Sequence, residues 1–245
     1  MTTITASPLA PPTRPRVQSL TRTARVTGAW YLGLAVTGML GFLVIRPQVF
    51  DADSAAATFA NLTDNAALAQ TGVALELGTV ITQAVLAVWF FKLYRIASPV
   101  AAAAIMVFGM ANAAAIMASA TFMGTALAVT ADPSLGGLDG PATTQLMYVM
   151  SENAWAVGNV FFGLWLIPMG WAVLRSGFAP RGLGWLLIAG SVGYVASAVV
   201  GFTLTDAPSA LVGGLSLPAT VGEFWMIAYL LIWGVRRSAN AEVTR

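Results

Sequence analysis

The sequence contains no cysteine and no histidine among its 245 residues. The missing cysteine excludes disulfide bonds, thiolate nucleophiles and thiolate metal sites. The missing histidine removes the commonest metal ligand and the commonest acid–base group of enzymes. Walker, Rossmann, serine-hydrolase and HExxH motifs are also absent from the sequence. We therefore expect no catalytic residue, no metal and no cofactor, and a protein that is not an enzyme.

Charged residues are scarce too, at 9% of the chain, whereas soluble domains contain about 25%. Hydrophobic residues make up 58%, and the mean hydropathy is +0.77. This composition is typical of an integral membrane protein. The net charge of +2 is too small to indicate a nucleic-acid partner, so the expected partner is the lipid bilayer.

Long apolar runs set the predicted architecture, because about 20 residues of helix cross a hydrocarbon core of about 30 Å. They predict an all-α, six-helix transmembrane bundle over residues 22–237, between a disordered tail at 1–21 and a tail at 238–245. The first run is too long for a signal-peptide core, so we interpret it as an uncleaved span. The predicted spans are residues 26–45, 66–91, 100–129, 146–174, 183–204 and 215–235.

Basic residues predict the orientation. Eleven of the 12 basic residues lie in the tails and loops on one side of the predicted membrane, and Arg46 is the exception. The loops on the other side carry Asp51, Asp53, Asp64, Asp132, Asp139 and Asp206. Because Lys and Arg accumulate in cytoplasmic loops, we expect both termini, with their tails, in the cytoplasm.

The loop between the first two spans is long enough for a short external helix. Asp53 precedes the segment SAAATFANL in the way that a helix N-cap does, and Asp64 could cap the second span. Arg46, at the start of this loop, could extend to the lipid headgroups or pair with Asp51 and Asp53.

Three glutamates fall inside the predicted spans: Glu76, Glu152 and Glu223. A charged side chain in hydrocarbon costs at least about 2.5 kcal/mol, so such residues usually face the protein interior or a wet cavity. Glu76 and Glu152 are each followed after seven residues by an amide, Gln83 and Asn159, and a step of seven returns to nearly the same face of a helix. This echo is compatible with three repeated helical hairpins.

Two interpretations of these glutamates remain open. They could form an outward-facing acidic pocket for a proton, a cation or an amine-bearing small molecule, as in a carrier or binding protein. They could instead hold helices together in a non-catalytic structural or sensory subunit, with partners such as Asn112, Tyr31, Tyr148, Tyr194 and Tyr229. The residues expected at the pocket are Arg46, Glu76, Gln83, Glu152, Asn153, Trp155, Asn159, Glu223 and Trp225.

Several long segments resemble a known family. The segments are GAWYLGLAVTG at 28–38, DADSAAATFANL at 51–62, GNVFFGLWLIPMGWAVLRSG at 158–177, APRGLGWLLIAGSVGYV at 179–195 and EFWMIAYLLIWGVR at 223–236. Together they are similar to the bacterial domain-of-unknown-function 4386 family. The resemblance implies a six-helix protein of the bacterial inner membrane with no assigned activity, and it supplies no site residues.

Overall fold

The computed structural model describes residues 14–137, 139–204 and 208–236, and every regular element in these ranges is helical. The predicted all-α class is therefore confirmed. The elements are α1 (Arg14–Met39), η1 (Leu40–Ile45), α2 (Arg46–Val49), α3 (Ala55–Asp64), α4 (Ala66–Tyr94), α5 (Pro99–Ala131), η2 (Pro133–Gly136), α6 (Gly140–Ser176), α7 (Arg181–Thr203) and α8 (Ser209–Ile232).

Six helices are long and apolar enough to cross a membrane, which makes this a multi-pass integral membrane protein. The first continues without a break through η1 and α2, and so extends past the predicted end at residue 45. The third and fourth are the longest, with 33 and 37 residues. The spans are Ser19–Val49, Ala66–Tyr94, Pro99–Ala131, Gly140–Ser176, Arg181–Thr203 and Leu211–Ile232.

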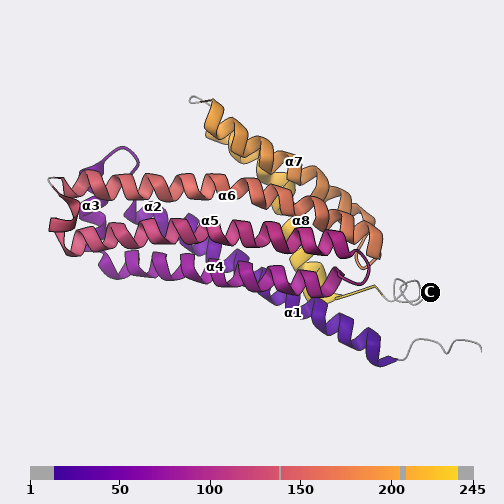
Figure 1. Cartoon of the computed structure of the whole chain (residues 1–245). Helices are drawn as coiled ribbons and strands as arrows, with labels where there is room; N and C mark the ends of the chain where they lie inside the picture. The colour runs from indigo at the N-terminus through magenta and orange to yellow at the C-terminus, as the bar shows by residue number, and fades with distance from the viewer. Residues whose placement is uncertain (1–13, 138, 205–207, 237–245) are drawn as a thin grey trace, which may run out of the picture.

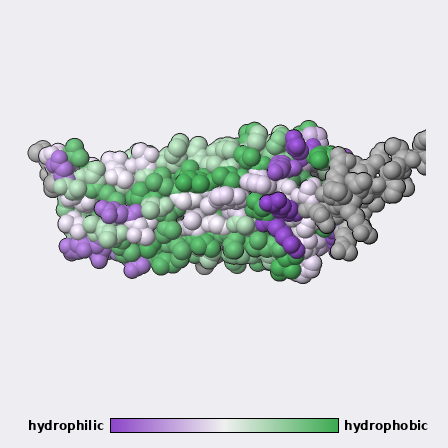
Figure 2. Space-filling model, turned by 90° about the horizontal axis from the view of Figure 1, so that it is seen from below, coloured by the Kyte–Doolittle hydropathy of each residue, from purple (hydrophilic) through white to green (hydrophobic). Residues whose placement is uncertain are grey.

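Neighbouring helices in the sequence lie side by side, and α8 returns to pack against α1 (Figure 1). One end of the bundle, here called the basic end, is where α1 begins and α8 ends. Figure 2 shows hydrophilic groups at both ends and a largely hydrophobic surface between them. The basic residues at the basic end include Arg22, Arg25, Lys92, Arg95, Arg175, Arg181 and Arg236.

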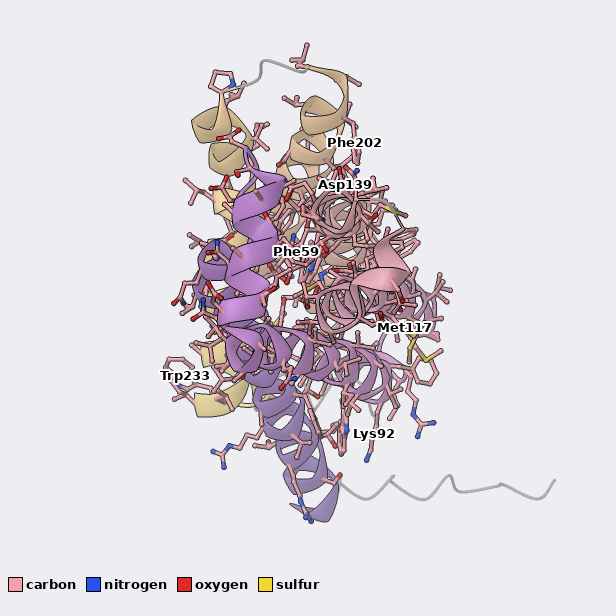
Figure 3. The ribbon with its side chains drawn as sticks, turned by 90° about the vertical axis from the view of Figure 1, so that its left-hand side faces the viewer. Phe59, Lys92, Met117, Asp139, Phe202 and Trp233 are labelled. Carbon is pink, nitrogen blue, oxygen red and sulfur yellow. The ribbon has the colours of Figure 1, made fainter. Side chains whose placement is uncertain are left out.

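The opposite end, here called the acidic end, carries the predicted short helix, α3. Phe59 of α3 contacts Gly140 at the start of α6, and both Phe59 and Asp139 lie at this end in Figure 3. The N-cap of α3 is Ser54, whose Oγ accepts a hydrogen bond from the backbone N–H of Ala57 at 3.1 Å. The predicted N-cap, Asp53, is therefore wrong by one residue.

Two further expectations about helix ends differ from the structure. Asp64 is the last residue of α3, and the N-cap of α4 is Asn65, without a side-chain capping bond. Residues 14–21 are helical rather than part of a disordered tail, because extending an existing helix adds one backbone hydrogen bond per residue, and Pro15 is tolerated in the first turn. The rest of that predicted tail and the tail at 238–245 lie outside the described residues.

The helices α7 and α8 pack closely on each other, but their halves toward the acidic end diverge from α6 (Figure 1). Val199, Phe202, Leu204, Leu211 and Leu217 in these halves are exposed. A membrane protein exposes such side chains to lipid without cost, so the divergent hairpin needs no further protein cover. A cavity described below lies at this divergence, beside α1 and α6.

Small residues allow the close contact between α7 and α8. A Cβ on Gly190 would lie 2.5 Å from the Cα of Ala219, and one on Gly193 would lie 2.0 Å from the carbonyl oxygen of Leu215. Close backbone approach at glycine is a common way for transmembrane helices to associate, since dispersion contacts replace the missing hydrophobic driving force.

We predict that Gly190→Ala lowers the free energy of unfolding by about 1–3 kcal/mol, because the new methyl group forces the two backbones apart. The control is Gly201→Ala on the same helix, where nothing lies within 4 Å of the added Cβ. This control should be neutral or stabilising by up to about 1 kcal/mol, since alanine has the higher helix propensity. The measurement is thermal unfolding of both variants in detergent, and equal stabilities would contradict the packing described.

Candidate functional site

The interior of α4, α5 and α6 is arranged in layers seven residues apart, a spacing of about 10.5 Å along a helix. One layer contains Glu76, Ser119 and Ser151, and all three side chains are buried. The next layer toward the basic end contains Gln83, Asn112 and Gly158, and the layer after that contains Phe90, Ile105 and Trp165. Two successive polar layers therefore lie within an otherwise apolar bundle.

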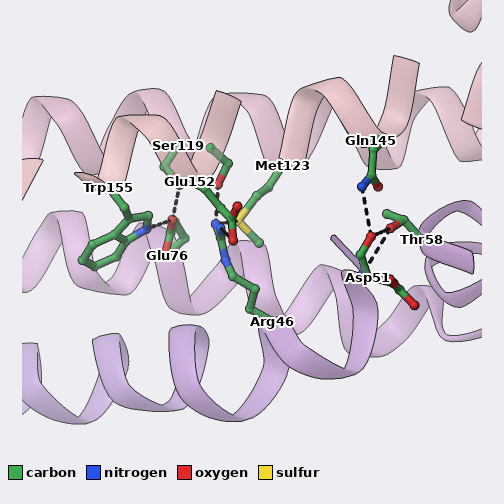
Figure 4. Close-up of polar contacts among 10 residues, drawn as sticks. Arg46, Asp51, Thr58, Glu76, Ser119, Met123, Gln145, Glu152 and Trp155 are labelled. Carbon is green, nitrogen blue, oxygen red and sulfur yellow. Dashed lines mark hydrogen bonds and ion pairs between the residues drawn. The ribbon is translucent and has the colours of Figure 1, made fainter. Parts of the chain in front are cut away.

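Glu76 accepts hydrogen bonds from two neighbouring helices (Figure 4). The hydroxyl of Ser119 on α5 and the indole Nε1–H of Trp155 on α6, at 2.6 Å, both donate to Oε1 of Glu76. The hydroxyl oxygens of Ser119 and Ser151 are 2.7 Å apart. Because Ser119 gives its only hydrogen to Glu76, the hydrogen between the two serines comes from Ser151.

Arg46 supplies the positive charge for this cluster. Its side chain is 5% exposed, and Nη2 donates to the hydroxyl of Ser151. Its Nη1 lies 3.8 Å from Oε1 of Glu152, and the guanidinium group lies over the rings of Phe42 and Tyr148, at 5.2 and 5.9 Å from their centroids. Donors thus run in one direction from Arg46 through the serines to Glu76. This chain of hydrogen bonds connects α2 with α4 through α5 and α6.

A π-helical segment, η1, carries Arg46 into the bundle. The backbone N–H of Arg46 bonds to the carbonyl of Gly41, five residues back instead of four. Pro47 follows directly, and a proline ring clashes with the carbonyl four residues before it, so a local departure from α geometry is expected here. Leu43 and Val44 then face outward, whereas Ile45 and Arg46 are buried.

The expected alternatives for Arg46, headgroup contact or pairing with Asp51 and Asp53, are not what the structure shows. Oδ1 of Asp51 instead accepts from the backbone N–H of Asp53, at 2.9 Å. The Asp51 carbonyl accepts from Gln145 of α6 and from Thr58 of α3, so this segment is fixed at the acidic end (Figure 4). The sequence predicts Arg46 outside the first span, because a charge usually marks the end of an apolar run.

Glu223 forms a second, separate cluster. The hydroxyl of Tyr31 on α1 donates to its Oε1 at 2.6 Å, and the hydroxyl of Tyr194 on α7 donates to its Oε2 at 3.3 Å. No basic side chain of the described ranges lies within ion-pair distance of Glu223. The described partners of this carboxyl group are therefore the two tyrosine hydroxyls.

A cavity of about 340 Å³ opens beside Glu223, between α1, α6, α7 and α8. Its wall is mostly apolar and aromatic, and it includes exposed side chains of α1 and α8 that face the hydrocarbon. Trp155 and Asn159 line it from α6. Because Nε1 of Trp155 also bonds to Glu76, this indole connects the cavity with the charged cluster.

The structure divides the residues expected at one acidic pocket among several places. Arg46, Glu76, Glu152 and Trp155 lie together, and Trp155, Asn159 and Glu223 line the cavity. Gln83 is buried, with Nε2 3.4 Å from the carbonyl oxygen of Gly109. Asn153 is exposed on α6 and is not part of the cavity wall, and Trp225 lines a different groove at the basic end.

The sequence did not identify Ser119 and Ser151, because serine is common in membrane helices and carries no charge. A spacing of seven does connect Ser119 with Asn112, as it connects Glu76 with Gln83. On α6 the buried positions of this spacing are Ser151 and Gly158, one residue before Glu152 and Asn159. One residue turns a helix by about 100°, so Glu152 is 44% exposed and lies at the edge of the cluster.

A family model described as "Domain of unknown function (DUF4386)" matches residues 26–234. The chain belongs to this family. The match covers all six spans almost completely, and therefore both carboxylate clusters of this DUF4386 protein. No curated protein and no solved structure matches the chain.

We predict that Arg46→Met lowers the free energy of unfolding by about 3–5 kcal/mol, because it leaves buried acceptors without their positive charge. Glu152→Gln should cost less than about 1 kcal/mol, since that carboxylate is partly exposed and its ion pair is long. The double variant Arg46→Met/Glu76→Gln should recover part of the loss. Denaturation of the three variants in detergent measures these differences. A neutral effect of Arg46→Met would show that the cluster does not stabilise the bundle.

Proposed function

We propose that this protein is a non-catalytic binding protein or carrier, which holds a small organic cation such as an amphiphilic amine in the cavity beside Glu223. One observation carries the proposal: a carboxylate with no basic partner in the described chain lies at the wall of an apolar and aromatic cavity. An amphiphilic amine has a positive charge that can pair with Glu223 and an apolar body that fits the apolar wall of the cavity. The volume of about 340 Å³ lies within the range of small-molecule sites.

The aromatic side chains of the cavity support the same chemistry. Tyr31, Trp155, Phe162 and Tyr194 line it, together with Phe42 and Phe224. Aromatic faces attract ammonium groups by about 0.5–2 kcal/mol, more when water is excluded. A proton on Glu223 is the simplest alternative occupant of the same position, and a proton and an amine would then compete for one carboxylate.

The Glu76 cluster supports the structural alternative for its own part of the molecule. Glu76 receives its hydrogen bonds from Ser119 and Trp155, and Arg46 stands behind the serines. A carboxylate that the protein itself satisfies in this way joins helices and leaves little for a ligand to contribute. We therefore assign packing to Glu76 and binding to Glu223.

We further propose that the basic end faces the cytoplasm of a bacterial cell, with the protein in the inner membrane and both termini inside. The support is the separation of charge. The described basic residues apart from Arg46 lie at one end, whereas Asp51, Asp53, Asp64, Asp132 and Asp139 lie at the other. Retention of Lys and Arg on the cytoplasmic side gives this orientation.

To test the site, we would follow the melting temperature in detergent with 2-phenylethylammonium and with the neutral 2-phenylethanol as probes. Only the ammonium compound should stabilise the parent protein, since a ligand at 100 times its Kd contributes about 2.7 kcal/mol. Glu223→Gln should abolish this stabilisation, and the matched control Glu152→Gln should keep it. Stabilisation by both probes, or its survival in Glu223→Gln, would refute a cation site at Glu223.

To test orientation, reporter domains can be fused after Arg95 and after Arg175, and inserted near Asp53 and near Asp139. The first two fusions should be active only as cytoplasmic reporters, because they follow the basic end. The other two should be active only outside. An external signal at Arg95 would reverse the proposed orientation.

A further inference from the structure

A groove of about 510 Å³ lies at the basic end, where α8 ends beside the start of α7. It is lined by Pro180, Trp225, Tyr229, Trp233, Val235 and Arg236. None of these residues belongs to the wall of the Glu223 cavity. Figure 3 places Trp233 at the periphery of the bundle, so the groove faces the surroundings of the protein rather than its interior.

The end of α8 fixes the geometry of this groove. Gly234 has a positive φ of 71°, a conformation that commonly ends helices, and its N–H bonds to the carbonyl of Tyr229 at 3.1 Å. The chain then turns back, and the N–H of Arg236 bonds to the carbonyl of Phe178 at 3.0 Å. The rings of Tyr229 and Trp233 are stacked, with centroids 5.5 Å apart. The backbone of Arg236 is thereby held against the turn between α6 and α7.

The electrostatic field at the groove favours an anion. Arg236 interacts with the hydroxyl of Tyr229 at one side, and the exposed Arg181 follows Pro180 directly. Within the described ranges, no acidic residue lies at this end of the bundle. Arg25 adds to the positive field, because its guanidinium group reaches the carbonyl of Ile232 at the end of α8.

The remainder of the groove is apolar and lies at the boundary of the membrane span. Trp225 and Trp233 are 39% and 59% exposed, and indoles in general favour the interface between headgroups and hydrocarbon. From Trp225, the exposed side chains of Val221 and Leu217 continue along α8 into the hydrophobic part of the surface. A ligand that fits has an anionic head at the arginines and an apolar chain along α8.

We propose that this groove binds an anionic phospholipid, with the phosphate diester between Arg181 and Arg236 and an acyl chain against Trp225. Basic pockets between transmembrane helices bind anionic headgroups through charge, and Trp and Tyr side chains favour the headgroup level of the membrane. The proposal does not depend on a ligand in the Glu223 cavity.

The experiment uses the full-length protein in a neutral detergent, with phosphatidylglycerol, phosphatidylcholine or inorganic phosphate added. Bound lipid is counted by native mass spectrometry, and stability is followed by melting temperature. Phosphatidylglycerol should bind and raise the melting temperature, and phosphatidylcholine should do so much less. Equal effects of the two lipids would overturn the proposal. An equal effect of inorganic phosphate would show an anion site without a lipid component, and would overturn it too.

Variants then locate the site. Arg236→Gln should weaken the binding of phosphatidylglycerol about fivefold, the effect expected for one basic contact at a membrane surface. Trp225→Leu, which keeps an apolar side chain, should also weaken it and provides a second test if Arg236→Gln folds poorly. The matched control is Arg95→Gln, an exposed arginine at the same end but outside the groove. If Arg95→Gln weakens binding as much as Arg236→Gln, the attraction is general to the basic end and the groove is not the site.

Discussion

The burial of one arginine in an apolar bundle is the constraint on which much of this structure depends. A guanidinium group at 5% exposure is tolerated only where acceptors and counter-charges surround it. Ser151, Ser119 and Glu76 provide them from three helices, and Glu152 adds a more distant charge. The π-helical η1, which ends directly before Arg46 and Pro47, turns the Arg46 side chain into the bundle. The packing of α1, α4, α5 and α6 toward the acidic end therefore depends on the hydrogen bonds and the ion pair of Arg46.

The two carboxylate clusters differ in what completes them. Glu76 is linked through two serines to Arg46, whereas Glu223 receives two tyrosine hydroxyls and lines a cavity whose described wall holds no basic side chain. Trp155 is the side chain common to both, since its N–H bonds to Glu76 and its ring lines the cavity. This member of a family of unknown function thus combines a buried ionic cluster with a separate aromatic cavity.

Hydropathy alone was sufficient to predict the six spans and the all-α class, because both follow from the length of apolar runs. It could not place Arg46, since a charge at the end of such a run is compatible with a loop as well as with a buried ion pair. It also could not fix the helical phase of α6, where Ser151 rather than Glu152 is buried. That phase depends on contacts with α5 that a single helix does not encode. The cap at Ser54 differs from Asp53 for a similar reason, because both residue types are good N-caps and only the backbone geometry selects one.

The divergence of α7 and α8 has a consequence for how any occupant of the cavity would be supplied. The wall includes Met39, Leu43 and Phe224, which face hydrocarbon, so the route of entry passes through the bilayer. The concentration that matters for binding at such a site is that of the amphiphile within the lipid. This concentration exceeds the one in water by the partition coefficient. Occupancy of the cavity would then depend on the number of ligand molecules per lipid molecule rather than on the ligand concentration in water. A weak intrinsic affinity would be enough to keep the cavity filled whenever the membrane contains a high concentration of the amphiphile.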